Sequence, residues 1–184
     1  MIRFYAPVVA LVVLAGFLWA GLQRDPGELP SPFIGRPAPT FRLPSLHDES
    51  VTFSEADLTG RVALVNVWGT WCPGCQTEHP VLMRMAEAGI PIYSINWKDD
   101  DAQAKRWLTQ LGDPYILTGA DRAGQAAIDW GVYGAPETFV VDAQGVVRYK
   151  HIGPITEALW QEVLLPAMRE AGEGTAAQAQ RSDR

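Results

Sequence analysis

The chain has 184 residues, of which 47% are hydrophobic and 20% are charged. This balance is typical of a globular domain and excludes a disordered or fibrous chain. The net charge of -6 argues against a nucleic-acid partner. With only two cysteines, the chain is not held together by a disulfide scaffold, so the pair needs another explanation.

The first 24 residues resemble a membrane anchor. Residues 4–22 are 19 consecutive residues without a charge, and at about 1.5 Å per residue a helix of this length covers the hydrocarbon core of a bilayer. A cleaved signal peptide is the competing interpretation, but its apolar run is usually ~7 to 15 residues, and no clean Ala-x-Ala site follows here. We therefore expect an uncleaved anchor over residues 1–24.

The charges that flank this segment indicate an orientation. Arg3 precedes it, whereas Arg24 is followed by Asp25 and Glu28. The positive-inside rule then leaves the N-terminus in the cytoplasm and puts the rest of the chain outside it. Both cysteines would then lie in an oxidising compartment, where a reduced pair must be maintained by an external donor.

Three further regions follow the anchor. Residues 25–40 hold five of the 14 prolines, which prevents a helix and predicts a stiff, extended spacer. Residues 41–171 carry the apolar periodicity of a folded domain. Residues 172–184 have no such periodicity, and we expect a disordered tail.

The order of elements within the domain predicts its fold. Apolar runs rich in β-branched residues predict buried strands, and helical patterns lie between and after them. The order is strand, helix, strand, helix, a hairpin and a closing helix, which is a thioredoxin-like α/β topology with a central mixed sheet flanked by helices. The expected strands are 62–68, 90–97, 139–142 and 146–151, and the expected helices are 72–88, 102–111 and 156–171.

The two cysteines form a Cys-x-x-Cys pair where a strand passes into a helix. There the unpaired N–H groups and the positive end of the helix dipole favour a thiolate, so Cys72 is the expected nucleophile. Cys75 lies about one turn further on the same face and is the expected resolving thiol. Pro73 suits the first helical position, and Gly74 lets a substrate backbone approach.

Other interpretations of the pair stay open at this point. The cysteines could be structural, but their spacing and context would then be coincidence. A metal chaperone could use both cysteines with His79, but its fourth ligand would have to be His47 or His151, each in a distant segment. We expect His79 to be a solvated helix residue instead.

A peroxidase is the remaining alternative. Residues 35–41 (GRPAPTF) resemble the opening of peroxiredoxins. Those enzymes use a single peroxidatic cysteine after a Thr, rather than a tight pair.

Four segments together resemble the CcmG/DsbE family of cytochrome c maturation thioredoxins, over residues 32–169. Trp71 and the Cys-x-x-Cys pair are shared by all thioredoxin relatives, but the third segment is more particular to this family. Gly74 and Trp97 depart from the residues expected at their positions. The segments are residues 71–79 (WCPGCQTEH), 96–100 (NWKDD), 131–139 (GVYGAPETF) and 148–153 (RYKHIG).

The resemblance implies roles for residues that the pattern alone leaves ambiguous. Pro136 resembles the cis-proline that faces the cysteines in thioredoxin folds. Glu78 matches a carboxyl that lies under the active site and takes the proton of the resolving thiol, whereas the pattern alone equally allows a solvent-facing Glu. Glu137 resembles an acidic residue that lines the active-site groove.

The resemblance also implies a function. Such a protein is a protein-disulfide reductase, anchored in the inner membrane and facing the periplasm, and it needs neither a metal nor an organic cofactor. Its client would be apocytochrome c or a maturation thiol protein of the CcmH type, and its electrons would come from a membrane carrier of the CcdA or DsbD type. The alternative is a general extracytoplasmic reductase of the TlpA/ResA type.

Overall fold

The computed structural model describes residues 2–22 and 33–182, with side chains at position 7 and over 9–19 and 33–174. The chain divides into two compact units, Met1–Pro30 and Ser31–Arg184. In the first unit, helix α1 (Ile2–Leu22) contains no acidic residue in its first turn and has Pro7 near its start. Its described apolar side chains, such as Val9 and Phe17, are exposed.

A membrane span has to be both long and apolar. Within the described part of the chain, no helix satisfies both conditions. The anchor over residues 1–24 therefore stays a prediction. Residues 25–32 of the predicted spacer lie outside the described residues.

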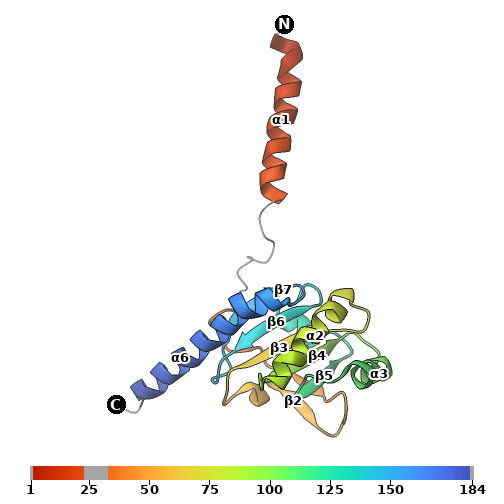
Figure 1. The fold of residues 1–184 in the computed structure, drawn as a ribbon, viewed down its shortest axis with the longest axis vertical. Helices are drawn as coiled ribbons and strands as arrows, with labels where there is room; N and C mark the ends of the chain where they lie inside the picture. The colour runs from red at the N-terminus through yellow and green to blue at the C-terminus, as the bar shows by residue number, and fades with distance from the viewer. Residues whose placement is uncertain (1, 23–32, 183–184) are drawn as a thin grey trace. The chain divides into compact units, whose positions relative to one another are not determined.

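The second unit is built on a mixed sheet of five strands in the order β5-β4-β3-β6-β7 (Figure 1). The central strand β3 pairs in parallel with β4 and antiparallel with β6. The outer strand β5 pairs in parallel with β4, and the outer strand β7 pairs antiparallel with β6. This arrangement confirms the predicted thioredoxin-like α/β fold. The strands are β3 (Ala63–Trp68), β4 (Ile92–Trp97), β5 (Leu117–Asp121), β6 (Glu137–Val141) and β7 (Val147–Ile152).

One face of the sheet is covered by helices. Parallel strands joined by a right-handed crossover put their connecting helices on the same side, and here these are α2 (Pro73–Glu87) after β3 and α3 (Asp101–Leu111) after β4. The closing segment consists of α5 (Glu157–Leu159), a π-helical turn η3 (Trp160–Leu164) and α6 (Leu165–Ser182). It packs on the same face, where Leu64 and Val140 of the sheet contact Leu82, Trp160 and Leu164.

The opposite face of the sheet is covered by a small hairpin and a short helix. Strands β1 (Arg42–Pro44) and β2 (Thr52–Ser54) pair antiparallel, and they are followed by the 3-10 turn η2 (Glu55–Leu58). Helix α4 (Gln125–Asp129) follows β5 and precedes β6 along the chain. The core on this side joins the alternate side chains of β3 and β6 to aromatic rings that include Phe41, Phe53 and Trp130.

Residues 33–40 differ from the predicted spacer because their backbone is bonded to the domain. Gly35 N–H donates to Val147 O and Ala38 N–H donates to Gly145 O, each at 2.8 Å. Pro37 forms a bridge with Val146. Proline prevents a helix in this segment, as expected, but an extended chain can still pair along a sheet edge. The folded unit therefore begins before Phe41.

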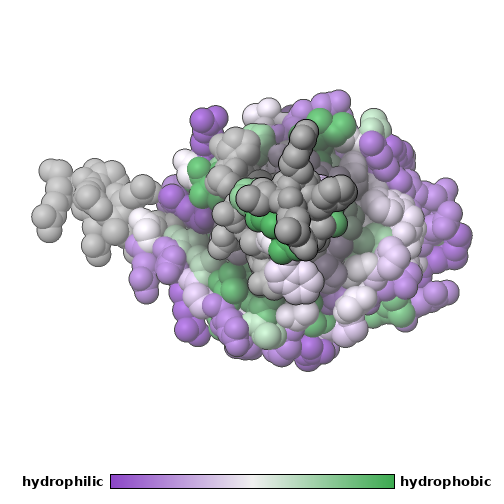
Figure 2. All heavy atoms as spheres, turned by 90° about the horizontal axis from the view of Figure 1, so that it is seen from above, coloured by the Kyte–Doolittle hydropathy of each residue, from purple (hydrophilic) through white to green (hydrophobic). Residues whose placement is uncertain are grey.

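The tail also differs from its prediction, because helix α6 runs on to Ser182. Residues 172–182 hold Ala, Glu, Gln and Arg, which are strong helix formers, so the helix continues although apolar periodicity ends. On the face of the domain seen in Figure 2, polar side chains (purple) predominate, with smaller apolar patches between them.

Candidate active site

The two cysteines lie where β3 passes into α2, and they are joined by a disulfide. Cys72 is the N-cap residue of the helix, in an extended conformation, and Pro73 occupies the first helical position. The Cys72 sulfur accepts a hydrogen bond from the Cys75 N–H at 3.1 Å. A sulfur in this place meets the unpaired N–H groups and the positive end of the dipole, which lower the cost of a thiolate.

Burial does not distinguish the two cysteine residues, since Cys72 and Cys75 are each only 2% exposed. Both pack into one apolar cluster. Cys75 lies inside the first turn, whereas Cys72 caps it, so the assignment of Cys72 as nucleophile rests on its position at the helix end. The other buried members of the cluster are Leu46, Trp68, Ala104, Leu108 and Ala120.

Pro136 lies against the turn that carries the cysteines. The Ala135–Pro136 peptide bond is cis, as the resemblance implied. A Cβ added to Gly74 would come within 2.9 Å of Pro136 Cδ and 3.0 Å of Pro154 Cγ. The first distance is shorter than real Cβ contacts and the second is at their lower limit, so the absence of a side chain at Gly74 lets two proline rings pack on the cysteine turn. We expected Gly74 to admit a substrate backbone, but the chain itself approaches there.

The loop before Cys72 is tied to the end of β4. Trp71 is 50% exposed, and its ring Nε1–H donates to Trp97 O at 3.2 Å. The Thr70 N–H and hydroxyl each donate to the Asp99 carboxylate at 2.6 Å. Asp99 also accepts from Asn96 Nδ2 at 2.9 Å. These bonds hold the backbone that leads into the nucleophile.

Glu78, on α2, is fully buried rather than facing solvent. Its Oε1 accepts from Asn66 Nδ2 and its Oε2 accepts from the Ile155 N–H, each at 2.9 Å. Burial penalises the charged carboxylate and raises the pKa of Glu78 from 4.5 to about 7, although the two hydrogen bonds oppose the shift. The carboxyl can therefore exchange a proton near neutral pH.

A polar network that was not predicted from the sequence surrounds Glu78. Asn66 Nδ2 also donates to Thr138 Oγ1 at 3.0 Å, and Asn66 Oδ1 accepts from the Tyr115 hydroxyl at 2.9 Å. Burial, together with the charge of Glu78, raises the pKa of Tyr115 well above its usual range. The sequence feature that could have predicted this network is the single Asn within the apolar run of β3, because a buried amide needs hydrogen-bond partners.

Glu137 lies on the other face of the sheet from Glu78. Side chains alternate along β6, and the neighbouring Thr138 accepts from Asn66, which also binds Glu78. Glu137 is fully buried. Its Oε1 accepts from the Tyr133 N–H at 2.8 Å and from the Gly134 N–H at 3.3 Å, while Oε2 lies 2.8 Å from Lys150 Nζ. The resemblance implied an acid that lines the groove, but the structure buries this one beneath the loop that carries Pro136.

The expectation that His79 is solvated is wrong. Its side chain is buried, and its ring lies edge-on to Trp107 with centroids 4.2 Å apart. Nε2 pairs with Gly112 O at 3.1 Å, and burial lowers the pKa of His79. The packing of α2 against α3 outweighs the polarity of the residue. His47 pairs with Asp113 instead, and nowhere in the described ranges do three His, Cys, Asp or Glu side chains gather as a metal site requires.

A disulfide at the N-terminus of a helix, facing a cis-proline above a thioredoxin-like sheet, defines the class of thioredoxin-fold disulfide oxidoreductases. Comparisons with known proteins agree. The family model described as Redoxin matches residues 34–163. The thiol:disulfide interchange protein DsbE of Pseudomonas aeruginosa is 50% identical over 164 residues, covering 89% of this chain and 91% of the relative. The Escherichia coli DsbE is 42% identical over 165 residues, covering 86% and 89%.

Solved structures show the same fold. A thiol:disulfide interchange protein of the thioredoxin family from Chlorobium tepidum has a TM-score of 0.59 and 28% identity, covering 72% of this chain and 95% of that one. A secreted thiol-disulfide isomerase from Corynebacterium glutamicum has a TM-score of 0.63 and 25% identity, covering 72% and 85%. The chain belongs to the redoxin family and, within it, to the DsbE thiol:disulfide interchange proteins. It is a disulfide oxidoreductase.

Proposed function

We propose that this protein is a membrane-anchored periplasmic reductant that acts in cytochrome c maturation through Cys72 and Cys75. The observation that carries the proposal is the cysteine pair at the N-terminus of α2, set above a buried Glu78 whose pKa is about 7. Such a site can exchange both electrons and a proton at neutral pH. The 50% identity to a DsbE protein supports the placement within this family.

The reaction consists of two exchanges between sulfurs. In the reduced protein, the Cys72 thiolate attacks one sulfur of the client disulfide, forms a mixed disulfide and releases the other client sulfur as a thiolate. Cys75 then loses its proton and attacks the Cys72 sulfur. This step forms the Cys72–Cys75 disulfide and releases the second client sulfur. The client has gained two electrons, and the protein has lost them.

Glu78 accepts the proton of Cys75 in the second step. It follows Cys75 by three residues on the same helix, so the two side chains share one face of α2. A carboxylate whose pKa is near neutrality is a better base than an ordinary Glu, which holds its proton too weakly. Both the electrons and the proton are then carried by side chains, and neither a metal nor an organic cofactor is needed.

The proposed partners are those that the resemblance to the CcmG/DsbE family implies. The client is apocytochrome c or a maturation thiol protein of the CcmH type, whose cysteines must be free before haem is attached. The oxidised protein is reduced again by a membrane thiol carrier of the CcdA or DsbD type. An oxidising compartment makes this external supply necessary.

A genetic test addresses the function. Cells that lack this protein should accumulate apocytochrome c without covalent haem, because the haem-binding cysteines stay oxidised. The wild-type protein should restore covalent haem, measured by haem staining of denatured proteins, and Cys72→Ser should not. Added dithiothreitol should bypass the defect. Normal haem attachment in the deletion strain would remove cytochrome c maturation and favour a general extracytoplasmic reductase.

A fusion test addresses the location. Residues 4–22 carry no charge, and α1 is helical over Ile2–Leu22. With Arg3 on the cytoplasmic side, alkaline phosphatase fused after Arg184 should be active, since this reporter works only outside the cytoplasm. The matched control moves the positive charge by combining Arg3→Glu with Asp25→Lys, and it should lower that activity. Activity of a cytoplasm-only reporter at the same position would contradict the periplasmic assignment.

A further inference from the structure

The loop over the disulfide is held from beneath by a buried ion pair that the exchange reaction does not itself use. Lys150 lies on β7 and pairs in register with Phe139 of β6, so both point to the same face of the sheet as Glu137. The side chains of Lys150 and Glu137 are 4% and 0% exposed, and Nζ lies 2.8 Å from Oε2. Among the described residues, Lys150 is the only one that forms an ion pair with Glu137, and Glu137 Oε2 has no other polar partner.

Both members of the pair bind the backbone of the same loop. Lys150 Nζ donates to Gly131 O at 2.7 Å. Glu137 accepts the Tyr133 and Gly134 N–H groups at 2.8 and 3.3 Å. The pair therefore fixes the backbone at three residues of the segment that ends at Pro136, namely Gly131, Tyr133 and Gly134. Charged groups make stronger hydrogen bonds than neutral ones, and burial strengthens them further.

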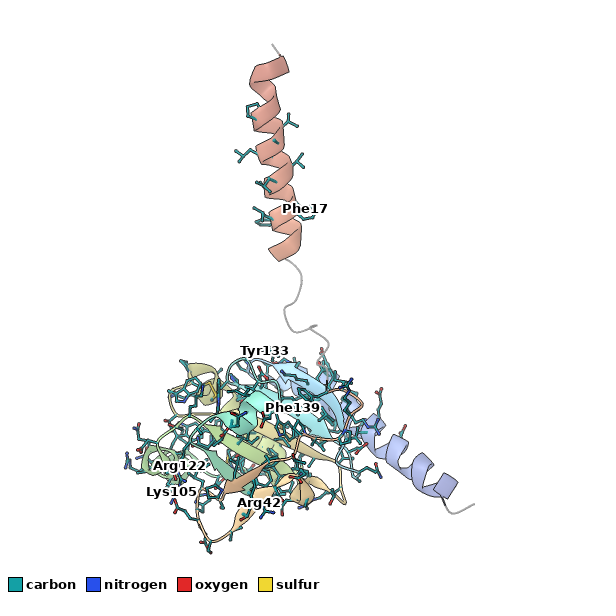
Figure 3. The ribbon with its side chains drawn as sticks, turned by 180° about the vertical axis from the view of Figure 1, so that it is seen from behind. Phe17, Arg42, Lys105, Arg122, Tyr133 and Phe139 are labelled. Carbon is teal, nitrogen blue, oxygen red and sulfur yellow. A yellow bond between two sulfur atoms is a disulfide. The ribbon has the colours of Figure 1, made fainter. Side chains whose placement is uncertain are left out.

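Above this pair, one aromatic side chain points outward. Tyr133 is 74% exposed, and Figure 3 shows it at the edge of the domain, whereas Phe139 lies within it. Lys150 Nζ nevertheless lies 4.8 Å from the centre of the Tyr133 ring and 5.3 Å from that of Phe139. The buried ammonium thus contacts a ring on the surface, which limits where that ring can lie.

We propose that Lys150 is a positioning residue for disulfide exchange: paired with Glu137, it holds the loop of residues 131–136 so that Pro136 lies on the cysteine turn and Tyr133 is presented to the client chain. Gly74 is the point of contact, since Pro136 already lies at the limit of approach there. A small displacement of the loop would change how a polypeptide client lies across the disulfide. A small disulfide, which needs no docking, would be affected little.

The experiment compares two oxidants of the reduced, full-length protein in detergent. One is a short peptide with an intramolecular Cys-x-x-Cys disulfide, and the other is hydroxyethyl disulfide. Lys150→Met should lower the rate constant for the peptide by up to about 10²-fold, while the rate with hydroxyethyl disulfide stays close to that of the wild type. Arg84→Met is the matched control. It removes an ion pair of equal length, 2.8 Å to Glu157, with both partners 56% exposed, and should behave as the wild type.

Glu137→Gln and the double variant, which carries both Lys150→Met and Glu137→Gln, complete a double-mutant cycle. Gln keeps an oxygen for the Tyr133 N–H, so Glu137→Gln tests the pair even where Lys150→Met is poorly folded. The double variant should lose less peptide reactivity than the product of the two single losses, because it leaves neither charge alone. The pH profile of Glu137→Gln should keep the shape of the wild-type profile.

Three results would overturn the inference. These are equal loss with both oxidants, a double variant that loses the full product of the single losses, or a pH profile that changes shape in Glu137→Gln. The last would make Glu137 an acid-base group. The inference rests only on exchange at Cys72–Cys75, so a failure of cytochrome c maturation in cells leaves it standing, and its own failure leaves the proposed function standing.

Discussion

Replacing Cys75 by Ser is expected to trap the client as a mixed disulfide, while replacing Cys72 by Ser traps little. Cys72 caps α2, and its sulfur accepts a hydrogen bond from the Cys75 N–H, so its thiolate is stabilised and attacks first. Without the second thiol, nothing within the protein discharges the adduct quickly. Catalytic turnover should be lost in both variants, but only Cys75→Ser should accumulate a covalent adduct.

The adduct is measured by non-reducing electrophoresis and identified by mass spectrometry. The proposed function predicts apocytochrome c, joined through a haem-binding cysteine, or a CcmH-type thiol protein. Ser at both positions is the control for background capture. Because the two cysteine residues are equally buried in the disulfide form, the predicted asymmetry rests on helix position rather than on residue exposure. Equal trapping by the two single variants would therefore reverse the argument from helix position, and recovery of unrelated envelope proteins alone would favour the general reductase.

The core of the fold could be predicted because its strands carry strong local signals. The strands β3 and β4 are mostly apolar and rich in β-branched and aromatic residues, and α2 begins at a Cys-Pro pair that suits a helix start. The strand β5 was missed, because Leu117–Asp121 is short and contains Gly119. That glycine is required by packing: a Cβ there would lie 2.8 Å from Leu43 Cδ1 and 2.9 Å from Phe53 Cδ1. Contacts between distant segments, which the local pattern does not contain, decide that strand.

The residues of the site could be predicted from the sequence, but the face of the sheet on which each of them lies could not. Cys72, Cys75 and Pro136 lie together because the thioredoxin-like topology brings the loop before β6 over the start of α2. Spacing along the sequence could not tell which face of the sheet each carboxyl occupies. Glu78 proves to be buried on the side of α2, and Glu137 on the opposite side with Lys150. Burial of a charged residue depends on a partner from another strand or loop, and no local pattern encodes it.

The buried carboxyl of Glu78 should make both stability and exchange depend on pH. Its pKa rises on folding from 4.5 to about 7, so between these values the folded protein holds a proton that the unfolded chain has released. The stabilising contribution is therefore complete below pH 4.5 and is lost as the pH rises through about 7. A shift of this size corresponds to about 3 kcal/mol of unfolding free energy.

In Glu78→Gln the side chain cannot ionise, so this part of the pH dependence should disappear. The free energy of unfolding of the oxidised protein, measured in urea from about pH 4.5 to about pH 8, should fall with pH in the wild type relative to the variant. Burial also lowers the pKa of His79, and its opposite contribution is common to both proteins. Glu157→Gln is the control, because Glu157 is exposed and its pKa is lowered, mainly by its hydrogen bond from Arg84. An equally steep fall in Glu78→Gln would assign the slope to another group.

The same substitution separates the chemical role of Glu78 from its structural one. If its carboxylate takes the Cys75 proton, Glu78→Gln should slow the release of the client from the mixed disulfide by about 10²-fold at neutral pH, as expected for a lost general base. Attack by Cys72, which needs no base within α2, should change much less. Rapid mixing of the reduced protein with a peptide disulfide, followed by acid quenching, measures the two steps separately. A variant that slows both steps equally, or neither, would leave Glu78 as a buried partner of Asn66 and Ile155 with no part in proton transfer.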